Sequence, residues 1–206
     1  IDGWQPGARA GISIMRIVSK LDAGPVFATD DLAIDEHTAG SLHDALAGLG
    51  AELLVRVFDD ILAGKAVAVE QDDAQATYAP KISKEDGFID WTQPAAQVHA
   101  RVRGVTPWPG ARTVFETAAA EGEQRPPLSL ILAPGKVGEA TGGAVPGAVF
   151  AGPDGLSVAC ADCWYVLSTV RPQGKKDMSA RDLLNGILRG LPRGLCGTAR
   201  VPVPGE

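Results

Sequence analysis

Residues 11–25, with the sequence GISIMRIVSKLDAGP, decide how the first part of the chain folds. Residues 11–18 alternate between apolar and polar side chains and then become apolar, which predicts a β-strand. Ser19, Asp22, Gly24 and Pro25 favour turns, so the strand is expected to end there. A second strand is predicted over residues 26–34. The stretch therefore predicts two strands joined by a loop that carries Asp22.

A long helix is predicted after the second strand. Thr38 suits the position before its first turn, because its hydroxyl can accept a hydrogen bond from a free backbone N–H. Apolar residues recur at helical spacing from residue 42 to residue 62, and Gly64 ends the pattern. Two strands and one helix leave apolar faces uncovered, so we expect residues upstream of Ile1 to complete this sheet.

The second part of the chain is predicted to be a small β-barrel with flanking helices. Residues 66–78 are polar and acidic and favour an extended linker. A short helix is expected over residues 94–103, capped by Thr92, and a last helix from Ser179 to Gly190. The tail after Gly194 is expected to be loose. Short strands at regular spacing predict the barrel, over residues 112–115, 128–133, 147–150, 155–160 and 164–170.

The composition is typical of a globular protein. Hydrophobic residues make up 45% of the 206 residues, and the 25 Gly and 15 Pro are spread along the chain, which indicates a turn-rich, partly β protein. No apolar run approaches the roughly 20 residues of a membrane helix, and no signal peptide opens the sequence. Three cysteines, an odd number, argue against a secreted disulfide framework. We therefore expect a cytoplasmic protein and no membrane partner. Because the first residue is Ile1 and not Met, we also expect a chain that was processed, cut or deliberately shortened.

Charge is distributed unevenly along the sequence. Residues 1–80 carry 5 Lys and Arg against 13 Asp and Glu, whereas residues 81–206 carry 14 against 12. The net charge of −6 therefore hides a second part that is slightly positive. Such an excess can form a local basic patch that binds nucleic acid.

Three stretches resemble a known family. Leu21-Asp22-Ala23-Gly24 resembles the Leu-Asp-x-Gly loop of folate-dependent formyltransferases. Residues 77–91, TYAPKISKEDGFIDW, resemble the junction into the C-terminal domain of the methionyl-tRNA formyltransferases, and residues 171–178, RPQGKKDM, resemble that domain's basic loop. Residues 103–112, RGVTPWPGAR, fit the same domain. The chain is identified as a member of this family that lacks the first half of the catalytic domain.

The resemblance implies an α/β fold in three parts. Residues 1–66 would be the remnant of a doubly wound formyltransferase domain, residues 67–80 a linker, and residues 81–206 an OB-like β-barrel that binds tRNA. The implied reaction moves a formyl group from formyl-tetrahydrofolate to the amino group of methionyl initiator tRNA in translation initiation. No metal is implied, and the sequence leaves the oligomeric state open.

Asp22 matches the catalytic Asp of the family, whose Asn and His partners are expected upstream of Ile1. A carboxylate can orient an imidazolium that donates to the developing oxyanion, or relay the proton of the attacking amine through water. Local sequence alone also allows Asp22 to be an ordinary turn residue. Residues 1–206 alone are expected not to transfer formyl groups. The resemblance places these residues along the pterin of the folate: Val18, Ser19, Lys20, Leu21, Ala23 and Gly24.

Basic residues of the second part are candidates for the tRNA backbone, because a Lys ammonium suits phosphate as a point charge. A solvated surface is the alternative for each of them. The candidates are Lys81, Lys84, Lys175, Lys176 and Arg181.

Cys160 and Cys163 have the spacing of a zinc ligand pair, but a four-ligand site needs two more ligands. The remaining thiol, Cys196, and the histidines are distant in sequence, so we interpret the pair as structural thiols. Two other functions stay open: a tRNA-binding module without catalysis, and a related folate-dependent formyltransferase that acts on a sugar nucleotide. Sequence upstream of Ile1 would separate the second from the main interpretation.

Overall fold

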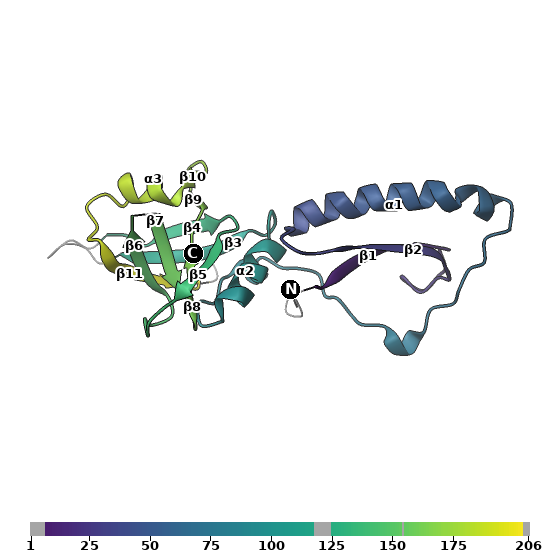
Figure 1. Ribbon diagram of the computed structural model, residues 1–206, viewed down its shortest axis with the longest axis horizontal. Helices are drawn as coiled ribbons and strands as arrows, with labels where there is room; N and C mark the ends of the chain where they lie inside the picture. Colours follow the sequence, from purple (N-terminus) through teal and green to yellow (C-terminus); the bar gives the residue numbers. More distant parts are fainter. Residues whose placement is uncertain (1–6, 118–124, 154, 204–206) are drawn as a thin grey trace. The chain divides into compact units, whose positions relative to one another are not determined.

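In the computed structural model, which describes residues 7–117, 125–153 and 155–203, the chain divides into two units at the bond between Lys81 and Ile82. The first unit contains strands β1 (Arg9–Met15) and β2 (Val26–Ala33), helix α1 (Ala39–Leu62) and a short 3-10 helix, Asp73–Gln75 (Figure 1). The second contains a nine-stranded antiparallel sheet and helices α2 (Ala95–Gly104) and α3 (Ala180–Asn185). The chain is thus a mixed α/β protein, as predicted.

The first unit is an antiparallel strand pair covered by α1. The register of the pair runs from Arg9 opposite Ala33 to Met15 opposite Val26. Thr38 caps α1 as predicted, because its hydroxyl accepts a hydrogen bond from the N–H of Ser41. β1 ends at Met15 and not at residue 18, since the backbone turns away there into the loop. An antiparallel pair of this kind is common at the edge of a larger mixed sheet.

One curled sheet forms the second unit. Its strand order is β10-β9-β4-β3-β11-β6-β7-β8-β5. α2 packs against β5 and β8, and α3 packs against β7, β9 and β10. The strands are β3 (Ala111–Thr117), β4 (Leu128–Leu132), β5 (Lys136–Ala140), β6 (Ala148–Gly152), β7 (Gly155–Ala159), β8 (Cys163–Val166), β9 (Thr169–Pro172), β10 (Met178–Ser179) and β11 (Gly194–Arg200).

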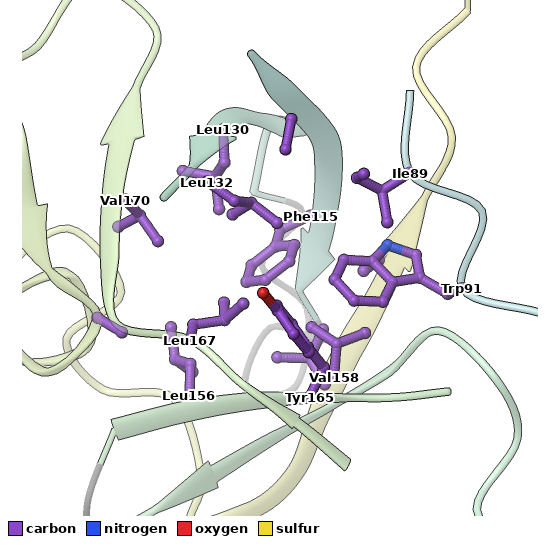
Figure 2. Packing of buried hydrophobic residues seen from close by; sticks show 14 of the residues in the cluster. Ile89, Trp91, Phe115, Leu130, Leu132, Leu156, Val158, Tyr165, Leu167 and Val170 are labelled. Atoms are coloured by element: carbon purple, nitrogen blue, oxygen red, sulfur yellow. The ribbon is translucent and has the colours of Figure 1, made fainter. Parts of the chain in front are cut away.

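Tyr165 lies in the middle of the core of this unit, where Figure 2 shows it among Phe115, Leu156 and Leu167. Its side chain is fully buried, and burial of so large an aromatic group contributes strongly to stability. The hydroxyl is satisfied, because it accepts a hydrogen bond from the N–H of Gly135 over 2.8 Å. Val170 of β9 and Tyr165 of β8, strands that lie next to the two ends of the sheet, belong to this one cluster, which is consistent with the curl of the sheet.

The tail after Gly194, which was expected to be loose, is the central strand β11. It pairs with β3 on one side and with β6 on the other. Cys196 and Ala199 point into the core and are buried. The prediction was wrong because the strand contains few large apolar residues: backbone pairing to two neighbours, rather than side-chain hydrophobicity, holds it in place.

A second expectation, that Thr92 caps α2, is also wrong. The cap position is Pro94, and the first free N–H of the helix, on Ala95, donates over 2.8 Å to the carboxylate of Asp162 in the turn between β7 and β8. Thr92 donates instead to Asp90. α3 begins after Ser179 as predicted but ends at Asn185, before Gly190. A cap from a residue distant in sequence cannot be read from local spacing.

In the described ranges of the chain, none of the helices has the length and apolar character needed to cross a membrane.

We expect Gly197→Val to destabilise the second unit. A Cβ at this position would lie 2.5 Å from the carbonyl oxygen of Glu116 and 2.9 Å from Cα of Thr117, both on β3. Overpacking of this kind costs about 1–3 kcal/mol. The urea midpoint measured by tryptophan fluorescence reports it. Thr198→Val, on the exposed side of the same strand, is the control and should shift stability by less than about 0.5 kcal/mol. Equal midpoints for both variants would contradict the placement of β11 beside β3.

Candidate functional site

The loop between β1 and β2 is closed by its own backbone. The N–H of Arg16 donates to the carbonyl of Pro25 over 2.9 Å. Gly24 is buried beside this closure, and a Cβ added to it would lie 1.7 Å from the carbonyl oxygen of Arg16. Only glycine allows two backbones to approach so closely. This approach gives a physical reason for the glycine in the Leu-Asp-x-Gly pattern.

Asp22 is exposed, two residues before Gly24. Its backbone is left-handed, with φ 55°, a conformation that Asp tolerates better than most residues. Within the described part of the chain, Asp22 is bonded through its main-chain carbonyl, and its carboxylate has no partner. The carboxylate is therefore available to a molecule that binds from solution.

The segment that follows α1 packs against this loop. Val26 and Val69 exchange backbone hydrogen bonds of 2.8 and 2.9 Å. Gln71 then donates from Nε2 to the carbonyls of Asp22 and Gly24, at 2.8 and 2.7 Å. Residues 67–80, predicted as a linker, thus hold part of the loop. No local pattern predicts the Gln71 contact, because its two partners, Asp22 and Gly24, lie 49 and 47 positions away in the chain.

A hollow of about 680 Å³ lies between the loop and this segment. Lys20, Leu21 and Ala23, three of the residues expected along the folate, line it with Asp22. Val18, Ser19 and Gly24 are not part of the lining: the first two are exposed, and Gly24 is buried. No histidine contributes to the lining in the described part of the chain. The segment supplies the opposite wall, through Gln71, Asp72, Asp73, Gln75, Ala76, Thr77, Tyr78 and Ala79.

Two carboxylates on that wall are held in place. Lys20 forms an ion pair with Asp73, with Nζ 2.8 Å from Oδ1. Hydrogen bonds from the side chain of Gln75 and the N–H of Ala74 lower the pKa of Asp72. Asp72 therefore stays ionised at neutral pH, and the hollow is rich in negative charge.

A separate groove of about 390 Å³ in the second unit collects three cations: Lys84, Arg112 and Arg171. Lys84 was predicted from the sequence, whereas the two arginines were not. Arg171 pairs with Asp177, with Nε 2.6 Å from Oδ1, and this guanidinium lowers the pKa of the Asp177 carboxyl. The groove also contains the acid Glu85, so its charge is positive overall rather than purely cationic. Positive charge beside Phe88 and Ser129 suits an anionic ligand with flat, apolar parts.

The other predicted basic residues are exposed but lie in different places. Lys175 and Lys176 lie in the turn between β9 and β10, four and five positions after Arg171 in the chain. Arg181 lies on α3, and its Nη2 donates to the carbonyl of Pro153 over 2.8 Å. Lys81 belongs to the first unit. Lys84 therefore lines the same groove as Arg171 and Gln173, which precede the Lys175–Lys176 turn. The five predicted residues do not form one cluster.

Cys160 and Cys163 flank the turn between β7 and β8. Cys160 is buried, and burial, with smaller effects of Asp162 and Cys163, raises the pKa of its thiol to about 12. Burial also raises the pKa of Cys196. All three thiols are free. A buried, protonated thiol is a poor metal ligand, and across the described ranges no three His, Cys, Asp or Glu side chains are placed to hold a metal ion.

The chain matches a family of known proteins. A family model described as formyl transferase, C-terminal domain, matches residues 81–188. The chain is 59% identical, over 98% of its length, to the methionyl-tRNA formyltransferase of Desulfovibrio desulfuricans. It is 43% identical, over 88% of its length, to the protein of the same name from Nitratidesulfovibrio vulgaris. It spans 60% of the first relative and 54% of the second.

Two solved structures share the fold. HypX from Aquifex aeolicus, in complex with tetrahydrofolic acid, aligns with 92% of this chain and 34% of its own, at 17% identity and a TM-score of 0.60. The N-formyltransferase from Helicobacter canadensis, in complex with folinic acid and dTDP-3-aminofucose, aligns with 77% of this chain and 55% of its own, at 12% identity and a TM-score of 0.57. Identities this low establish the likeness of the folds alone.

At pH 8 we expect iodoacetamide to alkylate Cys163 before Cys160 and Cys196. The thiolate is the form that reacts, Cys160 stays protonated because its pKa is about 12, and Cys163 is the one partly exposed thiol among the three. Peptide mass spectrometry after timed reactions measures the order. Labelling of Cys160 first would contradict its burial behind the β7–β8 turn.

Proposed function

The chain belongs to the formyl transferases that share this C-terminal domain, and from this membership we propose that its protein transfers a formyl group from formyl-tetrahydrofolate to the amino group of methionyl initiator tRNA. The observation that carries the proposal is the identity with methionyl-tRNA formyltransferases along almost the whole chain. Because the chain spans about three fifths of that relative, the activity is assigned to the whole protein and not to residues 1–206 alone.

Residues 1–66 are assigned to the end of the catalytic domain, and residues 81–206 to the tRNA-binding domain. The exposure of Val55, Phe58 and Leu62 on α1 supports the first assignment, since an isolated helix rarely leaves so much apolar surface uncovered. Translation initiation would place the protein in the cytoplasm.

Asp22 is assigned the role of the catalytic carboxylate. The attacking amine must lose a proton, and the formyl carbonyl becomes an oxyanion as the C–N bond forms. An exposed carboxylate without an internal partner can accept that proton through water, or orient a cationic imidazole supplied from elsewhere in the protein. Support comes from the position of Asp22 at the edge of the hollow, in a loop whose backbone is fixed on both sides.

The hollow beside Asp22 is assigned to the folate, with the reacting end of the donor at the loop. The carbonyl and N–H groups of residues 18–24 suit the polar edge of a pterin. Lys20, Leu21 and Ala23 line the hollow, which supports three of the six residues expected there. Formyl-tetrahydrofolate supplies the one-carbon group, and no protein residue needs to carry it covalently.

The basic groove of the second unit is assigned to the tRNA backbone. Lys84, Arg112 and Arg171 converge there, and Lys175 and Lys176 extend the charge along the adjacent turn. Contacts of this kind position an RNA without reading its sequence. Arg181 and Lys81 remain candidates at other points of the surface. Proteins that act on sugar nucleotides share the fold at much lower identity, so tRNA is the substrate that the relatives favour.

Asp22→Asn in the full-length protein should lower turnover by roughly 10²–10⁴-fold, the usual effect of lost acid–base assistance. The substitution keeps the shape of the side chain and its tolerance of a left-handed backbone. Formylation of methionyl-tRNA with formyl-tetrahydrofolate as donor is the assay. Asp35→Asn is the matched control, because Asp35 also has a positive φ, 36°, at another turn. If the unsubstituted full-length protein does not formylate methionyl-tRNA, the proposed function is wrong; if Asp22→Asn alone keeps normal turnover, only the role of Asp22 is wrong.

Neutralising Lys175 and Lys176 together, as Lys175→Ala with Lys176→Ala, should weaken tRNA binding and reduce its salt dependence by about two phosphate contacts. Folate affinity should stay the same, since the two sites lie in different units. Binding of tRNA at several salt concentrations gives the slope. The double variant Lys65→Ala with Lys136→Ala removes the same charge elsewhere and should leave the slope unchanged. An equal slope in both double variants would show that the turn is ordinary solvated surface.

A further inference from the structure

The side chain of Gln71 joins two carbonyls of the loop that carries Asp22. We propose that Gln71 is a positioning residue, which fixes the Asp22 carboxylate at the geometry that formyl transfer requires; the inference rests on the function proposed above. Neither the sequence pattern nor any relative's name assigns a role to this residue. Residues 67–80, which contain Gln71, would then form a supporting wall of the site and not only a linker.

The hydrogen bonds of Gln71 are specific. Its Nε2 lies 2.8 Å from the carbonyl oxygen of Asp22 and 2.7 Å from that of Gly24. A carboxamide nitrogen has two N–H groups, so each carbonyl can receive one of them. The amide oxygen could not take this place, because both partners are acceptors. One side chain therefore fixes the carbonyls on either side of Ala23.

The loop needs such an external support. Asp22 holds a left-handed backbone, which is unfavourable for a residue with a Cβ, and its carboxylate forms no bond to any described residue that would retain it. Gly24 is fixed from the inside by its packing on Arg16. Gln71 fixes the same short arc from the outside. Without it, the peptide between Asp22 and Gly24 could rotate, and the carboxylate would move with it.

A second contact between the loop and the segment after α1, the ion pair of Lys20 with Asp73, stabilises the loop less. Lys20 and Asp73 form an ion pair, but their side chains are 66% and 74% exposed, and exposed pairs are weak and screened by salt. The bond from Gln71 to Asp22 is exposed, but the bond from Gln71 to Gly24 is partly buried, where a hydrogen bond is stronger and its loss leaves a carbonyl unsatisfied. The backbone pairing of Val26 with Val69 places Gln71 two residues further along, opposite the loop. Gln71 is thus the main support on this side.

The chemistry of the side chain separates positioning from catalysis. A carboxamide does not titrate near neutral pH, and both of its N–H groups are used by the loop. Gln71 therefore has no proton to give to the substrate and acts through Asp22. Loss of such support misplaces a reacting group, and a misplacement of about 1 Å can cost on the order of 10²-fold in rate.

The test uses two substitutions in the full-length protein. Gln71→Glu keeps the size but replaces the donor with an acceptor, and Gln71→Met removes the donor without adding charge. Both should lower kcat for formylation by about 10²-fold, leave the KM for tRNA unchanged, and speed amide hydrogen exchange in residues 18–25. Gln97→Glu, on the exposed surface of α2, makes the same charge change and should match the unsubstituted protein in all three measurements.

The outcomes separate this inference from the function on which it rests. If the unsubstituted protein formylates methionyl-tRNA and Gln71→Met retains its kcat, the positioning role is wrong while the function stands. Equal losses in kcat and in tRNA affinity, with a lowered melting temperature, would show general unfolding and also overturn it. If the unsubstituted protein does not formylate methionyl-tRNA, the proposed function is wrong. The support of the loop by Gln71 is then judged from hydrogen exchange alone: unchanged amide exchange of residues 18–25 in both variants would overturn it.

Discussion

The burial of Tyr165 with its hydroxyl bonded is the interaction on which the second unit depends. The ring is fully buried among the other apolar residues of the core, and the hydrogen bond from the N–H of Gly135 offsets the penalty of burying a phenol. The same residue lies in β8, its ring lies 6.1 Å from that of Trp91, and its hydroxyl is 3.3 Å from Nδ1 of His99. One side chain thus joins the sheet to His99 of α2 and to Trp91, in the segment that precedes α2.

The first unit is stabilised differently at its candidate site, because the loop that carries Asp22 has few apolar contacts. There, backbone contact replaces side-chain packing: Gly24 lies against Arg16, and Gln71 reaches across from a segment without regular structure. Functional groups are commonly carried by loops that a rigid scaffold positions. In this protein part of the scaffold is itself a loop, and its rigidity comes from hydrogen bonds to carbonyls. The geometry of the loop that carries Asp22 therefore depends on a few polar contacts rather than on a large core.

Sequence patterns predicted those elements whose cause is local. α1 was found because its apolar residues repeat along one helix and Thr38 caps it, and the Asp22 loop because turn residues gather between two strands. β11 was missed because two neighbouring strands hold it, and β5 because its exposed side chains show no alternation. The role of Asp162 at α2 and that of Gln71 at the loop depend on pairs of residues 67 and 47 positions apart. Such contacts form only when the chain folds, so the local spacing of residues does not predict them.

The central place of β11 has a consequence for how the protein is made. Ribosomes add residues from the N-terminus, so Gly194–Arg200 emerge after the other described strands of the sheet. At synthesis rates of about 5–20 residues per second, roughly 4–16 seconds pass between the synthesis of β3 and that of β11. During that time β3 and β6 expose unpaired backbone edges, the kind of surface that joins chains to one another. A nascent chain of this protein therefore has an interval in which these edges can join other chains, and it ends only when β11 is released.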